Sequence, residues 1–159
     1  AATLSPLLKA LGAHVTGVAQ SAGDRGGFPV ITADDLPEHL PSTDLLIMIL
    51  PASDATRHAL DAERLALLPS HAWVVNVGRG STLDTAALLD ALHAGALGGA
   101  ALDVFETEPL PPESPLWDEP DVILTPHAAG GRPLGADALI AHNLRALLAG
   151  EPLRNVVER

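Results

Sequence analysis

Apolar residues in this chain fall into short continuous runs, separated by polar, glycine-rich or proline-rich segments. The runs predict strands at 14–18, 44–50, 72–77, 98–104 and 121–125. The run at 44–50, DLLIMIL, begins at Asp44, is followed by Pro51 and has only apolar residues between the two. Because alternation is absent there, we expect this strand to be buried on both faces.

Leucines recur at helical spacing between these runs. They predict helices at 2–11, 33–40, 55–68, 85–94 and 135–148. Asp84 is a suitable N-cap for the helix at 85–94, and Gly95 ends it. Residues 21–27 are rich in glycine and serine and are predicted to form a loop, as is the proline-rich segment 109–120. Strands that alternate with helices predict an α/β fold with a parallel sheet.

The composition is that of a globular domain with an aliphatic core. The 159 residues are 47% hydrophobic but only 3% aromatic. A formal net charge of −11 argues against nucleic acid and anionic membranes as partners, because like charges repel. The absence of cysteine excludes disulfides, thiolate ligands and cysteine nucleophiles. With no membrane-length apolar run and no signal peptide, we expect a cytoplasmic protein.

Charged or titratable side chains follow three of the predicted strands. Arg79 follows 72–77, Glu106 and Glu108 follow 98–104, and His127 follows 121–125. The carboxyl ends of parallel strands carry the chemistry of α/β proteins, so these residues form a candidate active site. A guanidinium binds carboxylates, an imidazole exchanges protons near neutral pH, and a carboxylate orients an imidazole. The residues alone leave open which glutamate is the partner, and whether Arg79 is a surface arginine.

The remaining histidines are interpreted as structural or solvated: His14, His39, His58, His71, His93 and His142. No pair among them has the spacing of metal ligands, so no metal site is predicted. The GRGST segment lacks the G-x-S-x-G pattern of hydrolases, and the third glycine position of a dinucleotide fingerprint starting at Gly78 is Leu83. These alternatives are therefore disfavoured.

Longer segments carry a family resemblance. VNVGRGSTLDTAALLDALHAGALGGAALDVFETEPLP, followed by TPHAAGG, closely resembles the D-isomer-specific 2-hydroxyacid dehydrogenases. ILPASDATRHAL and NLRALLAGEPLRNVV resemble further segments of the same family, so the likeness covers nearly the whole chain. It implies a Rossmann-like doubly wound parallel sheet that binds NAD or NADP. It also implies hydride transfer between that cofactor and C2 of a 2-keto or 2-hydroxy acid, as in hydroxypyruvate or glyoxylate reductases, by a homodimer.

The resemblance implies roles for residues that match the family motifs. His127 would be the acid/base, Glu108 would tune it, and Arg79 would bind the substrate carboxylate. Cofactor contacts are implied at a set of positions near the strand ends: Gln20, Ser21, Leu50, Pro51, Thr56, Val77, Gly78, Arg79, Asp103, His127 and Gly130. From the residues alone, Pro51 is equally well explained as a strand terminator.

The segment after the strand at 14–18 bears on cofactor choice. An aspartate at this point normally accepts hydrogen bonds from the adenosine 2′-hydroxyl of NAD. Here Gln20 and Ser21 stand instead, and no carboxylate would repel a 2′-phosphate. We therefore expect a slight preference for NADP, although the nearest arginine, Arg25, lies several residues further on in the predicted loop.

The same resemblance implies an N-terminally truncated fragment that lacks the first strand, its G-x-G-x-x-G turn and most of a substrate domain. We expect residues 1–134 to form a partial NAD(P)-binding domain, and residues 135–159 to form a C-terminal helix and tail that return toward the substrate domain. A sheet without its first strand leaves backbone groups unpaired. We therefore expect the isolated chain to fold poorly or to shift the strand at 14–18 to a new partner, to bind dinucleotide weakly and to be inactive. The alternative functions are a non-catalytic NAD(P)-sensing scaffold and an inactive fragment.

Overall fold

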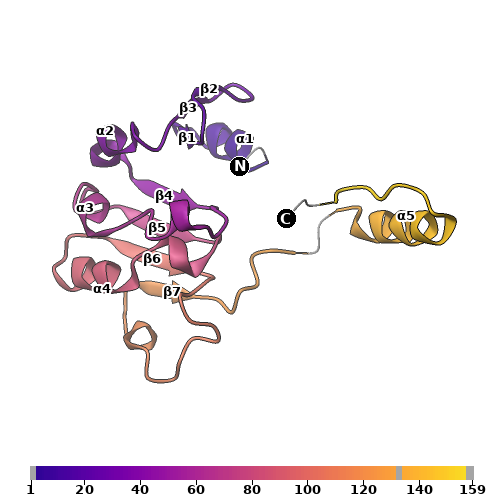
Figure 1. The fold of residues 1–159 in the computed structure, drawn as a ribbon. Coiled ribbons are helices and arrows are strands. Elements are labelled where there is room, and N and C mark those ends of the chain that lie inside the picture. The colour runs from indigo at the N-terminus through magenta and orange to yellow at the C-terminus, as the bar shows by residue number, and fades with distance from the viewer. Residues whose placement is uncertain (1–2, 132–133, 157–159) are drawn as a thin grey trace. The chain divides into compact units, whose positions relative to one another are not determined.

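The computed structural model describes residues 3–131 and 134–156. It divides into two compact units, Ala1–Ala129 and Gly130–Arg159 (Figure 1). The helices of the first unit are α1 (Leu4–Ala10), α2 (Leu36–His39), α3 (Ala62–Leu65) and α4 (Thr85–His93). Its short 3-10 helices are η1 (Leu40–Ser42), η2 (Asp54–Thr56), η3 (Gly80–Thr82) and η4 (Pro115–Trp117).

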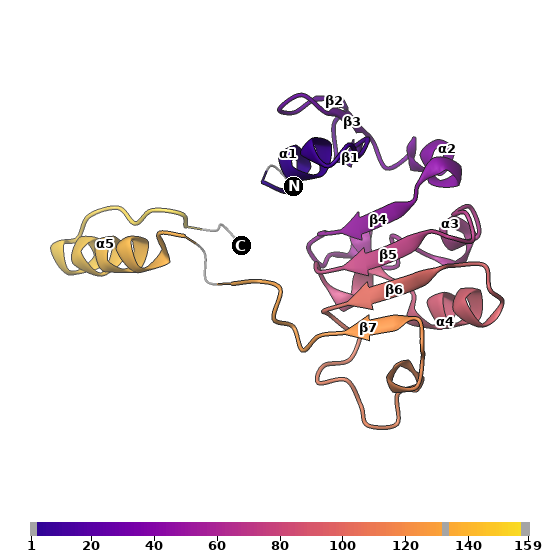
Figure 2. The ribbon, with the colours of Figure 1, turned by 180° about the vertical axis from the view of Figure 1, so that it is seen from behind.

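The first unit contains two sheets. One has the strand order β4-β5-β6-β7, with strands at Leu45–Met48, Trp73–Asn76, Gly99–Leu102 and Val122–Leu124. Its strands are all parallel, and their arrowheads point to the same side in Figure 2. The other has the order β1-β3-β2, with strands Gly17–Val18, Pro29–Ile31 and Gly23–Asp24. The expected α/β class with a parallel sheet is confirmed.

The strand neighbours within each of the two sheets follow a doubly wound order. In the doubly wound order 3-2-1-4-5-6, the second and third strands pair, and the fourth pairs with the fifth. Here β1 pairs with β3 in parallel and β4 pairs with β5 in parallel. Among the described residues no strand pairs with both β1 and β4.

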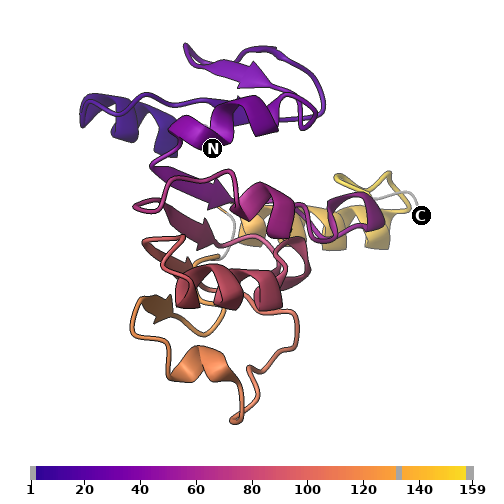
Figure 3. The same ribbon diagram turned by 90° about the vertical axis from the view of Figure 1, so that its left-hand side faces the viewer.

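The core lies on one face of the four-stranded sheet. Val74 on β5 and Ala100 and Leu102 on β6 point to the same face, because they are two residues apart or directly paired in register. They are buried together with Leu65 of α3 and Leu88 of α4. These two helices lie next to each other in front of the strands in Figure 3. Aliphatic packing on this face therefore sets the positions of the strand ends.

The expectation that 44–50 is buried on both faces is wrong. Met48 is buried, but Leu45 is 46% exposed and Ile49 is 50% exposed. Ile123 on β7 is also exposed. In the described part of the chain, the helices of the core cover only the other face of the sheet. An uninterrupted apolar run thus marked the strand correctly without showing which of its faces is covered.

Two further element predictions need correction. The predicted helix at 55–68 is instead η2, a non-helical turn and α3, because the backbone N–H groups of His58 and Leu60 donate to the carbonyls of Ser81 and Thr82. These bonds take the place of helical ones. The predicted loop at 21–27 contains β2, which is held by hydrogen bonding to β3 and is too short to show a hydrophobic period.

Other boundaries agree closely with the pattern. Asp84 caps α4 by accepting a hydrogen bond from the Ala87 N–H at 3.0 Å, as predicted. Asp61 caps α3 in the same way.

The predicted strand at 14–18 is shorter in the structure. It is reduced to the two residues of β1, because only Gly17 and Val18 pair with β3.

The second unit consists of α5 (Ala136–Ala149) and a tail. Gly150 ends the helix with a left-handed backbone (φ 70°), close to the predicted end at 148. The tail folds back on the helix, because the Asn143 amide both donates to and accepts from the backbone of Arg154, at 3.0 Å each. Across the described parts of both units, no helix has the length and apolar character needed to span a bilayer.

Candidate functional site

The loops that follow β5, β6 and β7 meet at the carboxyl end of the sheet. Arg79, Glu108 and His127, which follow these strands in turn, border one cleft of about 220 Å³. The full lining is Ala52, Arg79, Gly80, Ser81, Phe105, Glu106, Glu108 and His127. The structure thus brings together the three residues to which the resemblance gives catalytic roles.

His127 and Glu108 form a directed pair. The Nδ1 atom of His127 lies 2.8 Å from Oε2 of Glu108. The other carboxylate oxygen of Glu108 accepts the backbone N–H of Phe105 at 3.0 Å. The Phe105 N–H first, and then the imidazole, lower the pKa of Glu108 below its ordinary value. An ionised carboxylate fixed at both oxygens therefore orients the His127 ring, whose Nε2 has no hydrogen-bond partner among the described residues.

Asp103 fixes the backbone that carries His127. His127 has a left-handed backbone (φ 53°), which is uncommon for a residue with a side chain. The carboxylate of Asp103, only 3% exposed, accepts the N–H groups of Ala128 and Ala129 and the hydroxyl of Thr125. Burial raises the pKa of Asp103, but these hydrogen bonds outweigh it and lower the pKa overall. Both carboxylate oxygens thus anchor the loop around His127.

Arg79 lies on a turn that is braced from within. Buried Asn76 accepts the Gly78 N–H at 3.0 Å and donates to the Arg79 carbonyl at 3.1 Å. The Arg79 guanidinium donates to the Gly78 carbonyl. It forms no ion pair with any carboxylate of the described residues. The cleft therefore contains a cation whose charge is available to an anion.

Gly80 lets the Arg79 loop and the Glu108 loop touch. A Cβ atom placed on Gly80 would lie 1.8 Å from the carbonyl carbon of Phe105. No side chain fits in that space, because the obstacle is backbone. The close approach of these two loops sets how near Arg79 lies to Glu108.

The ends of β4 and β5 also come together. A Cβ on Gly78 would lie 2.7 Å from the backbone N of Leu50, so the residues that follow β4 and those that follow β5 are in close contact. Thr56 donates its hydroxyl to the Pro51 carbonyl at 2.7 Å. A second cleft adjoins the first through shared residues; it is lined by Ala52, Ser53, Asp54, Arg57 and Ser81. The expected cofactor positions at these strand ends are thus neighbours in space.

Two of the expected cofactor positions lie after β1, away from this cleft. Gln20 and Ser21 are exposed. The side chain of Arg25 donates to the hydroxyl of Ser21 at 3.1 Å, so this arginine is within reach of a group bound at Ser21. Arg25 lies in the loop between β2 and β3, several residues after β1 as expected, and its long side chain reaches back four positions to Ser21. Gly130, the last expected position, belongs to the second unit.

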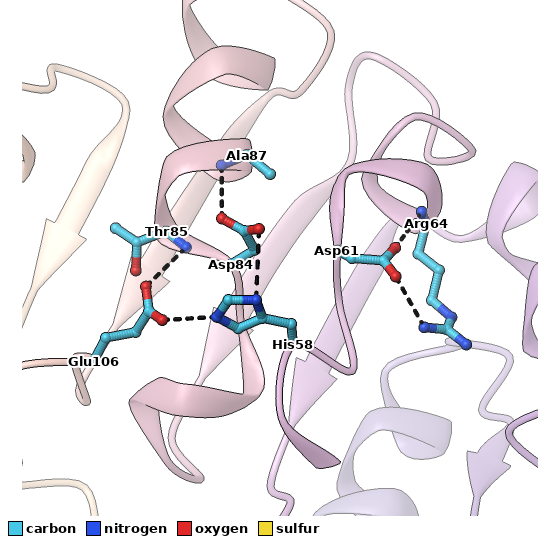
Figure 4. Close-up of polar contacts among 7 residues, drawn as sticks. All are labelled: His58, Asp61, Arg64, Asp84, Thr85, Ala87 and Glu106. Atoms are coloured by element: carbon cyan, nitrogen blue, oxygen red, sulfur yellow. Dashed lines mark hydrogen bonds and ion pairs between the residues drawn. The ribbon is translucent and has the colours of Figure 1, made fainter. Parts of the chain in front are cut away.

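One cluster was missed in the sequence. His58, interpreted as structural or solvated, places Nε2 2.8 Å from Oε1 of Glu106 and Nδ1 3.6 Å from Oδ2 of Asp84 (Figure 4). Glu106 lies on the wall of the first cleft. The two partners His58 and Glu106 are 48 positions apart, so no local spacing could have indicated the contact.

Comparison with known families settles the family of the chain. Residues 1–129 match the model described as "D-isomer specific 2-hydroxyacid dehydrogenase, NAD binding domain". The chain belongs to this family. The resemblance seen in the sequence is confirmed, and with it the Rossmann-like fold and NAD or NADP as the class of cofactor.

Curated relatives of this dehydrogenase chain include reductases. Glyoxylate/hydroxypyruvate reductase A from Klebsiella pneumoniae (strain 342) is 44% identical over 126 residues. The match covers 79% of this chain and 40% of that protein. The chain therefore spans less than half the length of such curated relatives.

Solved structures of the family superpose well. An NADPH-dependent glyoxylate/hydroxypyruvate reductase from Sinorhizobium meliloti, in complex with NADP and sulfate, is 36% identical with a TM-score of 0.86, covering 98% of this chain and 51% of that one. A D-isomer specific 2-hydroxyacid dehydrogenase from Xanthobacter autotrophicus Py2, in complex with NADPH and MES, is 40% identical, with a TM-score of 0.81. The match covers 92% of this chain and 62% of that one.

Proposed function

We propose that the intact protein reduces short 2-keto acids of the glyoxylate and hydroxypyruvate class to 2-hydroxy acids, with NADPH as reductant. The observation that carries this proposal is the cleft in which Arg79, which has no carboxylate partner among the described residues, borders the His127–Glu108 pair. A cation for a carboxylate and an oriented proton donor are what this reaction requires. The reductase names of the relatives agree with it.

His127 would deliver the proton in this reaction. When bound, the reduced nicotinamide supplies two electrons and a hydrogen to the carbonyl carbon, so the carbonyl oxygen gains negative charge and must take up a proton. His127 is held at Nδ1 by Glu108, which leaves Nε2 to donate. Glu108, whose pKa is lowered, stays ionised and holds the ring in one orientation for the transfer. The imidazole then recovers a proton from solvent, since its side chain is 46% exposed.

Arg79 would bind the acid. A planar guanidinium pairs with a carboxylate through two parallel hydrogen bonds and fixes its orientation. The turn that carries Arg79 is braced by Asn76, and its position against the 105–108 loop is fixed by Gly80. Binding the carboxylate there would place the neighbouring carbonyl group at the His127 side of the same cleft.

The residues near the strand ends fit a dinucleotide. The two clefts share Ala52 and Ser81, and the second contains Arg57 and the hydroxyl of Ser53. A cation and a hydroxyl at that place suit the negatively charged pyrophosphate. Leu50, Pro51, Val77 and Gly78 would hold the adjoining ribose, and Asp103 would lie near the carboxamide while its carboxylate anchors the His127 loop.

The end of β1 supports the preference for NADP. No carboxylate stands at Gln20 or Ser21, and Arg25 contacts the Ser21 hydroxyl at 3.1 Å. A guanidinium and a hydroxyl together can bind a 2′-phosphate. Replacing Arg25 with alanine in the intact protein should raise KM for NADPH and leave KM for NADH unchanged. Equal changes in both constants would contradict this assignment.

A non-catalytic NAD(P)-sensing scaffold is the alternative. A sensor needs the cofactor contacts but not a carboxylate-held imidazole beside an unpaired arginine. Steady-state reduction of glyoxylate and hydroxypyruvate by the intact protein, with NADPH and with NADH, separates the two functions. We expect turnover with a higher kcat/KM for NADPH. Cofactor binding without turnover would favour the sensor, and a preference for NADH would contradict the NADP proposal.

A further inference from the structure

His58 joins the loops that follow three neighbouring strands. It belongs to the segment after β4, and its backbone N–H donates to the Ser81 carbonyl in the loop after β5 at 2.8 Å. Its ring contacts Glu106 in the loop after β6 at 2.8 Å and faces Asp84, at the start of α4, at 3.6 Å (Figure 4). The side chains of His58 and Glu106 are only about one-third exposed, at 32% and 31%.

Glu106 is held on both sides. Its Oε1 contacts the ring of His58, and its Oε2 accepts the backbone N–H of Thr85 at 3.3 Å. Burial raises the pKa of Glu106, but the hydrogen bonds from His58 and Thr85 outweigh it and lower the pKa overall. The carboxylate therefore remains ionised near neutral pH and can bind an imidazole N–H strongly.

The position of Glu106 matters because Glu108 is two residues further along the same short segment. That segment rests on Gly80 at one end, and Glu108 is bonded to the Phe105 N–H within it. A shift of Glu106 would therefore move Glu108, and with it the ring of His127. No side chain of this cluster needs to touch substrate to have that effect.

We propose that His58, acting through Glu106, is a positioning residue that sets Glu108 and His127 against Arg79 for reduction of the keto acid. The proposal rests on the proposed reductase function. His58 is not itself a proton donor to substrate, because both of its ring nitrogens face carboxylates. Asp84, which also caps α4, fixes the orientation of the ring.

Variants of His58 separate positioning from a general structural role. Its backbone is left-handed (φ 46°), a conformation that asparagine tolerates better than glutamine. The glutamine amide, however, extends to the position of Nε2 and can donate to Glu106, whereas the asparagine amide is too short. Positioning thus predicts higher activity for His58→Gln than for His58→Asn, and backbone preference alone predicts the reverse order.

The test is steady-state kinetics in the intact protein, with NADPH and glyoxylate. We expect His58→Asn to lower kcat about 10- to 100-fold, as small misplacements in active sites do, with little change in KM for glyoxylate. His58→Gln should recover most of kcat. Glu106→Gln should lower kcat as His58→Asn does, and combining it with His58→Asn should add little. His71→Asn is the matched control, because His71 makes an equally short contact with Asp44 away from the cleft.

Equal kcat in the wild type and His58→Asn, or better activity for His58→Asn than for His58→Gln, would overturn the proposal. If His58→Asn does not fold, Glu106→Gln decides the matter: unchanged kcat overturns the proposal and reduced kcat supports it. Hydrogen exchange of the 105–108 amides supplies a readout independent of turnover. Faster exchange in His58→Asn is expected even if the wild type reduces no keto acid. Absence of turnover in the wild type would reject the reductase function but not the positioning of the loop by His58.

Discussion

Two histidine–glutamate pairs meet at one loop, where their glutamates, Glu106 and Glu108, are two residues apart. The pairs differ in whether the second ring nitrogen of the histidine also faces a carboxylate. Nδ1 of His127 contacts Glu108 at 2.8 Å, and its Nε2 has no partner among the described residues. His58 contacts Glu106 at the same distance, but its second nitrogen faces Asp84. The first pair is equipped to transfer a proton, while the second holds loops together.

The comparison shows why a short histidine–carboxylate contact does not identify a catalytic residue by itself. Both pairs border the same cleft through their glutamates, and both histidines have left-handed backbones. The distinguishing features are the free nitrogen of His127 and the unpaired arginine beside it. The following substitutions, in the intact protein, test that distinction in order of decreasing expected effect.

Replacing His127 with asparagine should have the largest effect, because it removes the proposed proton donor while suiting the left-handed backbone. We expect kcat for keto acid reduction to fall about 10²- to 10⁴-fold. NADPH binding, measured by fluorescence titration, should be unchanged. If kcat falls less than the His58→Asn variant's does, the assignment of the two pairs is reversed.

Arg79→Lys should mainly affect substrate binding. Lysine keeps the charge but loses the planar two-bond contact with a carboxylate. We expect KM for glyoxylate to rise about 10- to 100-fold, which corresponds to losing a charge-assisted hydrogen bond. Steady-state kinetics measures this, and Arg64→Lys is the control because Arg64 pairs with Asp61 on α3. An unchanged KM would show that the acid binds elsewhere.

Glu108→Gln should have a smaller effect on kcat than loss of the histidine, because the amide still holds the ring but carries no charge. We expect about a tenfold decrease, with KM for glyoxylate nearly unchanged. Measuring kcat for Glu108→Gln and Glu106→Gln side by side compares a direct partner of His127 with an indirect one. A greater loss from Glu106→Gln would contradict the roles given to the two pairs.

Asp103→Asn should act on stability and only weakly on kcat. An amide cannot accept at both ends, so we expect unfolding free energy to fall by about 1–3 kcal/mol at pH 7. Because the pKa of Asp103 is lowered from 3.8 by folding, its ionised form stabilises the fold above pH 3.8. That contribution is lost as pH falls through the lowered pKa. Urea unfolding at several pH values should show the difference between wild type and variant narrowing below pH 3.8, and a constant difference would refute this.

Much of the fold could be predicted from local pattern. The strands β4 to β7 are aliphatic runs, and the start of α4 is marked by Asp84. The pattern failed where hydrogen bonds to another segment decide the structure. β2 exists because it pairs with β3, and residues 58–60 are not helical because His58 and Leu60 donate to the loop after β5. Neither partner can be recognised from spacing along the chain.

By itself, the sequence determined the fold class, the family and the three side chains Arg79, Glu108 and His127, because strand periodicity and motif order are local properties. Only the tertiary structure showed that Glu106 binds His58, and it placed Glu108, the glutamate that the family motif implies, against His127. Those contacts depend on loops from different strands meeting at one end of the sheet. Hydrogen bonding there is set by distances of a few ångströms, which the order of residues does not encode directly.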